Sequence, residues 1–100
     1  DIVPTADVII DEVCKFYNID PATLRGQGRS KDISLARQIS MYLIRRMTNL
    51  SLKEIGREFD NRDHTTVLHS IERIEDLSKN DPEKAEIIKD IIANINSRYE

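Results

Sequence analysis

One hundred residues suit a single domain, and a chain of this length can bury enough surface to fold without covalent cross-links. Cys14 is the only cysteine, which excludes an internal disulfide and is typical of a reducing, intracellular compartment. No apolar run approaches the roughly 20 residues that cross a bilayer, so we predict no membrane contact. Because the chain starts at Asp1 rather than methionine, we expect a fragment of a longer protein, with residues 1–4 ending a linker.

The first part of the chain predicts helices, because its apolar residues recur at helical spacing and do not alternate. Residues 5–17 form the first predicted helix, with Phe16 on its buried stripe and Cys14 as a small core residue. Residues 20–24 begin with Asp-Pro, a cap followed by proline, and predict one further short turn of helix. The basic segment 25–31 has two glycines and no apolar residue, so it is predicted to be a mobile loop.

A long helix is predicted over residues 32–48, with Ser40 small enough to be tolerated on its buried face. After a break, residues 51–54 read Ser-Leu-Lys-Glu, which is a capping box in which the serine and the glutamate satisfy each other's amides. The helix that it begins is predicted to end near Phe59.

The remaining chain predicts a turn at residues 60–62, a helix over residues 63–78 and a last helix from Asp81-Pro82. The buried side chains expected on the helix over residues 63–78 are Val67, Leu68, Ile71, Ile74 and Leu77. Together these elements predict an all-α, compact domain of about six helices.

Residues 51–70 have the length of a helix-turn-helix, which gives the domain a Trp-repressor-like architecture. Gly56 lies where the two helices would cross, and a small residue there lets the backbones approach. The turn contains no glycine, so Asp60 and Asn61 must supply any left-handed conformation. Many helical hairpins share this pattern, so the spacing alone does not establish DNA binding.

The second helix of this pair opens with four polar residues. His64 can donate to guanine or thymine, Asp63 can accept from cytosine, and Thr65 and Thr66 can contact thymine methyls, bases or phosphates. These residue types favour a helix that reads a major groove. Helix capping alone is the alternative for Asp63 and Thr65.

Charge is unevenly distributed, although the net charge is only −3. Residues 1–24 carry five acids and one base, residues 25–73 ten bases and six acids, and residues 74–100 seven acids and four bases. A basic middle suits contact with a phosphate backbone. The alternative is that these charges only solvate helix faces.

Five arginines of the basic middle are candidates for DNA contact. Arg37, Arg45, Arg57 and Arg62 could bind phosphates, and Arg29 in the loop could enter a minor groove. Each could instead be a solvated surface side chain.

The sequence contains no motif that indicates an enzyme. His64 and His69 are five residues apart, which is not the spacing of a helical metal pair. We therefore predict no catalytic residue, no metal ligand and no cofactor in this chain.

The sequence resembles a known family. Ile55-Gly56, Phe59 and the run Arg-Asp-His-Thr-Thr-Val-Leu-His at residues 62–69 are similar to the signature of DnaA, the bacterial chromosomal replication initiator. The resemblance covers essentially the whole chain, as the C-terminal DNA-binding domain, domain IV. Arg37-Gln38 also fits the pattern.

The resemblance implies sequence-specific binding of double-stranded DNA at DnaA boxes of the replication origin, with transcription regulation as a further role. It implies base reading by Asp63, His64 and Thr65, and entry of Arg29 into the minor groove. The phosphate contacts that it implies are Thr66, Arg37, Gln38, Arg45 and the backbone near Leu52 and Lys53. The loop before Arg29 is less basic than is usual in the family, which implies weaker non-specific affinity.

The resemblance also implies properties of the longer protein. ATP and magnesium would bind an AAA+ domain outside this chain, and self-assembly would use other domains. The expected location is the bacterial cytoplasm and nucleoid, and the acidic first and last helices could contact regulatory proteins. Two alternatives stay open: a helix-turn-helix of a transcription regulator, and a helical protein-interaction module.

Overall fold

The computed structural model describes residues 3–100, and all regular structure in that range is helical. The helices are α1 (Ala6–Tyr17), α2 (Pro21–Arg25), α3 (Lys31–Met47), α4 (Leu52–Glu58), α5 (His64–Asn80) and α6 (Pro82–Ser97). The prediction of an all-α fold with about six helices is confirmed, and α5 continues two residues beyond its predicted end.

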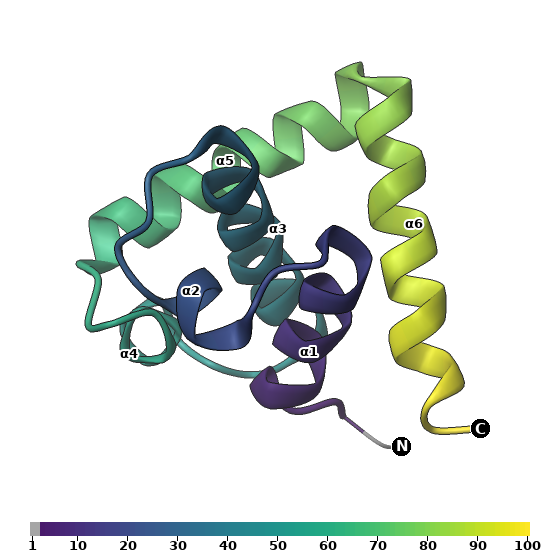
Figure 1. The fold of residues 1–100 in the computed structure, drawn as a ribbon, viewed down its shortest axis with the longest axis horizontal. Coiled ribbons are helices and arrows are strands. Elements are labelled where there is room, and N and C mark those ends of the chain that lie inside the picture. The colour runs from purple at the N-terminus through teal and green to yellow at the C-terminus, as the bar shows by residue number, and fades with distance from the viewer. Residues whose placement is uncertain (1–2) are drawn as a thin grey trace.

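Helix α3 forms the centre of the fold. It packs against α1, α2, α4 and α5, and it runs through the middle of the molecule in Figure 1. Residues 39–44 are all buried, a run too continuous for a helix with one covered face. The neighbours on several sides explain this burial. Ser40 is fully buried and its hydroxyl donates to the Ala36 carbonyl at 2.9 Å, so the prediction that it is tolerated in the core is confirmed.

The predicted helix starts are confirmed by their capping bonds. Thr5 accepts from the Val8 amide at 3.2 Å, and Asp20 and Asp81 cap α2 and α6 in the same way. At the start of α4 the Ser51 amide donates to the Glu54 carboxylate at 3.0 Å, and the Glu54 amide donates to the Ser51 hydroxyl at 3.1 Å. Local polar side chains therefore fix where these helices begin.

Two predicted core residues are exposed. Phe16 is 42% exposed and Leu68 is 39% exposed, whereas Cys14 is buried as predicted. On α5 the buried positions are 67, 70, 71 and 74, which follow helical spacing, and Leu68 lies one residue outside that stripe. Phe16 lies in the last turn of α1, where its ring packs edge-on against Tyr17 at 5.2 Å between centroids.

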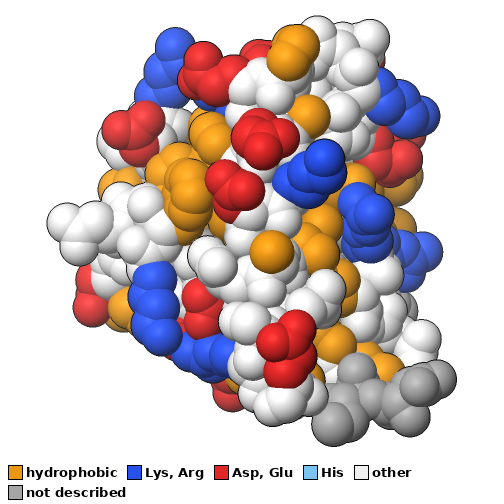
Figure 2. Space-filling view, turned by 90° about the vertical axis from the view of Figure 1, so that its right-hand side faces the viewer, with side chains coloured by type: hydrophobic (Ala, Val, Ile, Leu, Met, Phe, Trp, Pro, Cys, Tyr) orange, Lys and Arg blue, Asp and Glu red, His pale blue; other side chains and the backbone are white. Residues whose placement is uncertain are grey.

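Helix α6 stands at one side of the molecule and packs on α1 and α5 (Figure 1). The surface on this side is mixed: Figure 2 shows hydrophobic side chains between Lys, Arg, Asp and Glu. Within residues 3–100, no helix has the length and apolar character of a membrane span.

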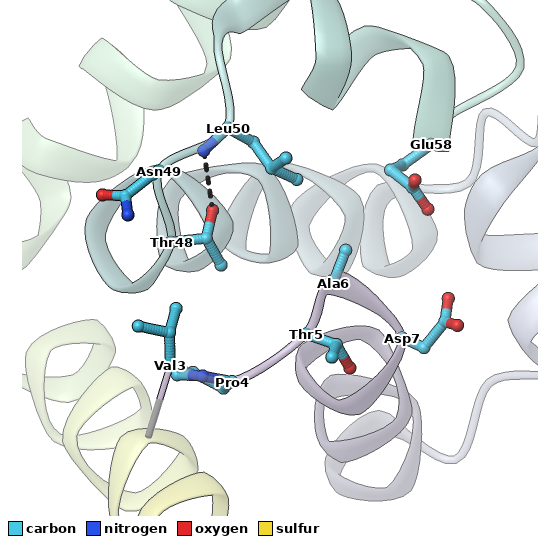
Figure 3. Close-up of a pocket in the computed structure, with 9 residues that line it drawn as sticks. All are labelled: Val3, Pro4, Thr5, Ala6, Asp7, Thr48, Asn49, Leu50 and Glu58. Carbon is cyan, nitrogen blue, oxygen red and sulfur yellow. Dashed lines mark hydrogen bonds between the residues drawn. The ribbon is translucent and has the colours of Figure 1, made fainter. Parts of the chain in front are cut away.

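The N-terminal segment lies against the connection between α3 and α4. Residues 3–7 line a surface pocket together with residues 48–50 and Glu58 (Figure 3). Thr48 stabilises that connection, because its hydroxyl oxygen accepts from the Leu50 amide at 3.2 Å. Of the predicted linker end, residues 1–2 lie outside the described residues, and Val3 and Pro4 contribute to this pocket.

Candidate nucleic-acid interface

The turn between α4 and α5 has the geometry that its sequence predicted. Asp60 and Asn61 both adopt left-handed backbone conformations, with φ of 59° and 54°. Gly56 of α4 packs directly against the backbone of the turn, since a Cβ there would lie 2.2 Å from the carbonyl oxygen of Arg62. The Arg62 amide donates to the Gly56 carbonyl at 3.0 Å, which closes the turn. The helix-turn-helix is therefore tightly packed without a glycine in the turn itself.

The first turn of α5 presents polar side chains to solvent. Asp63 is the N-cap, and its Oδ2 accepts from the Thr65 amide at 2.9 Å. The Thr65 backbone hydrogen bond is the main reason that the pKa of Asp63 lies below its ordinary value. The next three residues, His64, Thr65 and Thr66, are all exposed. This turn can therefore contact another molecule without disturbing the core.

Two adjoining depressions flank this turn, and His64 borders both. One is lined by Arg45, Ser51, Leu52, Lys53 and His64. The other is lined by Lys53, Arg57, Asn61, Arg62, Asp63 and His64. The structure thus brings predicted contact residues from α3, α4 and α5 onto one continuous surface.

Arg45 and Gln38 lie seven residues apart on α3, which is two helical turns and therefore the same side of the helix. Arg45 is exposed, and its Nη1 donates to the Leu50 carbonyl at 3.1 Å. Gln38 is half-buried and accepts from Nη1 of Arg73 on α5 at 3.0 Å. Lys53 is exposed in the first turn of α4, where Leu52 is half-buried.

Arg37 does not offer the free guanidinium that the sequence predicted. It is only 6% exposed, its Nε donates to the Leu24 carbonyl at 2.8 Å, and its Nη1 donates to the Gly28 carbonyl at 3.0 Å. Burial, and then the charge of nearby Arg62, lower the pKa of Arg37. The side chain therefore points inward to backbone carbonyls, and the phosphate contact of Arg37 stays a prediction.

The side chain of Arg62 is also directed toward a backbone carbonyl, and its phosphate contact likewise stays a prediction. It is half-buried, and its Nη2 donates to the Gly26 carbonyl at 2.9 Å. The segment 25–31, predicted as mobile, is thus held by hydrogen bonds from distant parts of the chain. Arg29 is exposed on this loop, and among the described residues its side chain has no hydrogen bond or ion pair. His69 is also exposed, with its Nδ1 3.6 Å from the Glu72 carboxylate, so it is not a packing residue.

The sequence did not predict the contact between Gln27 and Asp60, whose side chains join the loop to the turn through a hydrogen bond of 2.8 Å. The two residues are 33 positions apart, so no local pattern signals their contact. A search of the described residues for clustered metal-binding side chains finds none.

Comparison with known proteins identifies the family of this interface. Residues 6–74, which include the whole turn and most of α5, match the family described as bacterial dnaA protein helix-turn-helix. The chain belongs to the DnaA family. This part of a DnaA protein is its helix-turn-helix domain, not a catalytic domain.

The DnaA relatives extend over much of the chain. Identity is 52% over 75 residues with the chromosomal replication initiator protein DnaA of Synechococcus sp. (strain JA-2-3B'a(2-13)), covering 75% of this chain and 16% of that protein. It is 42% over 95 residues with the DnaA of Crocosphaera subtropica, covering 95% of this chain and 21% of that protein. The chain therefore spans about a fifth of the length of these relatives or less.

A solved structure supports the same assignment. A crystal structure described as that of a DNA replication initiation factor superposes on 93% of this chain with a TM-score of 0.80 and 30% identity. The superposed part is 29% of that longer chain. The helical arrangement is thus shared with part of a DNA replication initiation factor.

Proposed function

We propose that this domain binds double-stranded DNA in the initiation of bacterial chromosome replication, and that it recognises DnaA boxes specifically. The observation that supports this proposal is the exposed first turn of α5. Base-reading side chains gather there beside cations from two other helices. Membership of the DnaA family points the same way.

In this proposal α5 lies in the major groove with its N-terminus toward the bases. Asp63, His64 and Thr65 contact base edges, and Thr66 contacts the backbone. The positive end of the α5 dipole favours the nearby phosphates. A helix that presents its first turn to base edges is the usual docking mode of a helix-turn-helix.

The other exposed residues extend the contact to the phosphates on either side. Arg45 and Lys53 lie next to His64 and carry the charge that phosphate binding needs. Gln38, Leu52 and the start of α4 complete this edge of the surface. Arg29, on the loop beside the turn, enters the neighbouring minor groove.

The same proposal places this domain in the cytoplasm, at the nucleoid. Binding of ATP and magnesium, self-assembly and regulation of transcription belong to the longer protein, and contacts with regulatory proteins would use faces other than α5.

Selection from a random duplex library, followed by fluorescence anisotropy on the selected duplex and a scrambled one, tests the proposal. The unmodified domain should prefer the selected duplex by at least tenfold. The family resemblance implies that DnaA boxes are short and asymmetric, so a selected sequence with two-fold symmetry would contradict box recognition. His64→Ala should lose roughly 1–3 kcal/mol of that preference while its thermal unfolding stays unchanged. Equal binding to both duplexes by the unmodified domain would refute sequence specificity.

A further inference from the structure

The loop between α2 and α3 is bound to the turn of the helix-turn-helix. Nη2 of Arg62 donates to the Gly26 carbonyl at 2.9 Å and approaches Oε1 of Gln27 at 3.4 Å. Nε2 of Gln27 in turn donates to Oδ2 of Asp60 at 2.8 Å. These bonds join two segments that lie side by side in Figure 1 although more than 30 residues separate them in sequence. The loop and the turn therefore form one connected unit.

The same loop is held from its other side. Arg37 donates to the carbonyls of Leu24 and Gly28, so it holds both ends of the segment 24–28. Arg25 donates to the Glu58 carboxylate at 2.8 Å and so ties the beginning of the loop to the end of α4. Hydrogen bonds from charged donors are the stronger class, and burial of Arg37 removes competing water.

Arg29 is the next residue after this anchored segment, and Ser30 caps α3 immediately after it. The loop therefore fixes the place from which the exposed Arg29 side chain extends. On the other side of the contact, Arg62 directly precedes Asp63, the cap of α5. The Arg62 guanidinium thus connects the loop that carries Arg29 to the turn that precedes His64.

We propose that Arg62 and Arg37 are positioning residues that hold Arg29 at a fixed distance from the first turn of α5, so that the minor-groove and major-groove contacts form together. The inference rests on the proposed function. It gives these two arginines a role other than phosphate binding: they set the geometry in which another residue binds. Pre-organisation of this kind strengthens binding because the loop loses less conformational entropy when the complex forms.

The first test uses the domain without DNA. Backbone 15N order parameters are measured for residues 26–30 in the unmodified domain and in the variants Arg62→Ala and Gln27→Ala. Both substitutions should lower the loop values from about 0.85 to below about 0.6, with α5 unchanged. Arg57→Ala is the matched control, because it removes the same charge beside the turn but Arg57 has no hydrogen bond to the loop within the described residues. Loop values unchanged in Arg62→Ala would overturn the proposal.

The second test is a double-mutant cycle on the selected duplex. Arg29→Ala should weaken binding roughly tenfold, which lies in the lower part of the range of affinity lost when one contact in a DNA groove is removed. Arg62→Ala should weaken binding by a similar factor alone and by little more in the Arg29→Ala background, because its effect acts through Arg29. Arg57→Ala should weaken binding by the same factor in the unmodified domain and in the Arg29→Ala variant.

A direct phosphate contact by Arg62 would give a different result. The losses from Arg62→Ala and Arg29→Ala would then multiply, and Arg62→Ala would lower the salt slope by about 0.9 even without Arg29, which would overturn the proposal. If the unmodified domain shows no sequence preference, the proposed function fails, whereas the order parameters still decide whether Arg62 holds the loop.

Discussion

Asp63 has a structural role at the start of α5 and is also assigned a recognition role in the proposed function. One carboxylate oxygen caps α5 by accepting from the Thr65 amide at 2.9 Å. The side chain nevertheless remains 65% exposed, so it can also meet a base edge. The cap therefore leaves the side chain free for the proposed base contact, and a substitution is needed to separate the two roles.

Asp63→Asn separates the two roles, because asparagine caps helices about as well as aspartate but adds an amide donor beside the base edges. We expect thermal stability to change by less than about 0.5 kcal/mol, with a changed base preference at the contacted position in a repeated library selection. Asp63→Ala should differ by losing roughly 1 kcal/mol of stability through the missing cap. An unchanged selected sequence for Asp63→Asn would show that Asp63 only caps the helix.

The exposure of side chains was predictable from the sequence where it depends on neighbours in the chain. His64, Thr65 and Thr66 follow a capping residue and precede the buried stripe, which places them on an exposed first turn. Arg37 and Arg62 could not be assigned in this way. Their guanidinium groups bind carbonyls 9 to 36 residues away, and that choice depends on the tertiary fold.

At the scale of elements, the helix-turn-helix depends on Gly56. A Cβ at this position would lie 2.2 Å from the backbone oxygen of Arg62, and backbone cannot move aside as a flexible side chain does. Gly28 differs, because the nearest atom to an added Cβ is a methyl of Ile33 at 3.4 Å. Substitution of Gly56 therefore tests the close packing at this position, and the same substitution of Gly28 is the control.

Gly56→Ala should reduce the free energy of unfolding by roughly 1–3 kcal/mol, the usual cost of overpacking, despite the higher helix propensity of alanine. Urea unfolding followed by circular dichroism measures this change. Gly28→Ala, treated in the same way, should stay within about 0.5 kcal/mol of the unmodified domain. Equal stability of the two variants would mean that the turn backbone at Arg62 can move away from α4 without cost.

The end of α3 carries two adjacent arginines with different surroundings. Arg45 borders the depression next to His64, whereas Nη1 of Arg46 donates to the Tyr42 hydroxyl at 3.1 Å. Arg46 also lines a groove that reaches α6, away from the first turn of α5. Only Arg45 is therefore placed on the proposed interface.

Arg45→Ala should weaken binding to all duplexes and lower the slope of log affinity against log salt concentration by about 0.9, the value for one lost phosphate contact. Anisotropy titrations at several salt concentrations measure that slope. Arg46→Ala serves as the charge-matched comparison and should leave the slope as it is. A common slope for Arg45→Ala and the unmodified domain would exclude the phosphate contact.

Helix boundaries were largely predictable, since caps are local signals, and Asp20, Ser51 and Asp81 all cap helices where the sequence predicted them. Burial was less predictable. Leu68 is exposed because the stripe that faces α3 and α4 passes through Val67 instead, and only the packing of neighbouring helices decides between the two.

At the scale of the whole molecule, α6 is tied to α1 near its C-terminus. Nε of Arg98 lies 2.6 Å from the buried Glu12 carboxylate, and its Nη2 also pairs with Asp11. Burial alone would raise the pKa of Asp11, but hydrogen bonds from Arg98 and Lys15 outweigh it and hold this pKa below its ordinary value. The ionised form of Asp11 thus stabilises the folded state.

A carboxyl group whose folded pKa is depressed contributes stability above its unfolded pKa, near 3.8 for Asp11, and loses that contribution as the pH falls through the folded value. Arg98→Ala should therefore lower the melting temperature at pH 7, with a difference that shrinks as the pH falls below about 4. Melting curves between pH 7 and pH 2.5 measure this change. A constant difference across that range would show that the ion pairs do not account for the effect of Arg98.

The separation of charge along the chain becomes a separation in space. The acidic first and last parts of the chain meet where α1 packs on α6, whereas α4 and the start of α5 lie on the opposite side from α6 (Figure 1). The cations Arg45, Lys53 and Arg57 border the depressions beside His64, and the field of a duplex would turn these cations toward it before contact. We expect this alignment to raise the association rate, and to fade once added salt shortens the screening length well below the size of the domain.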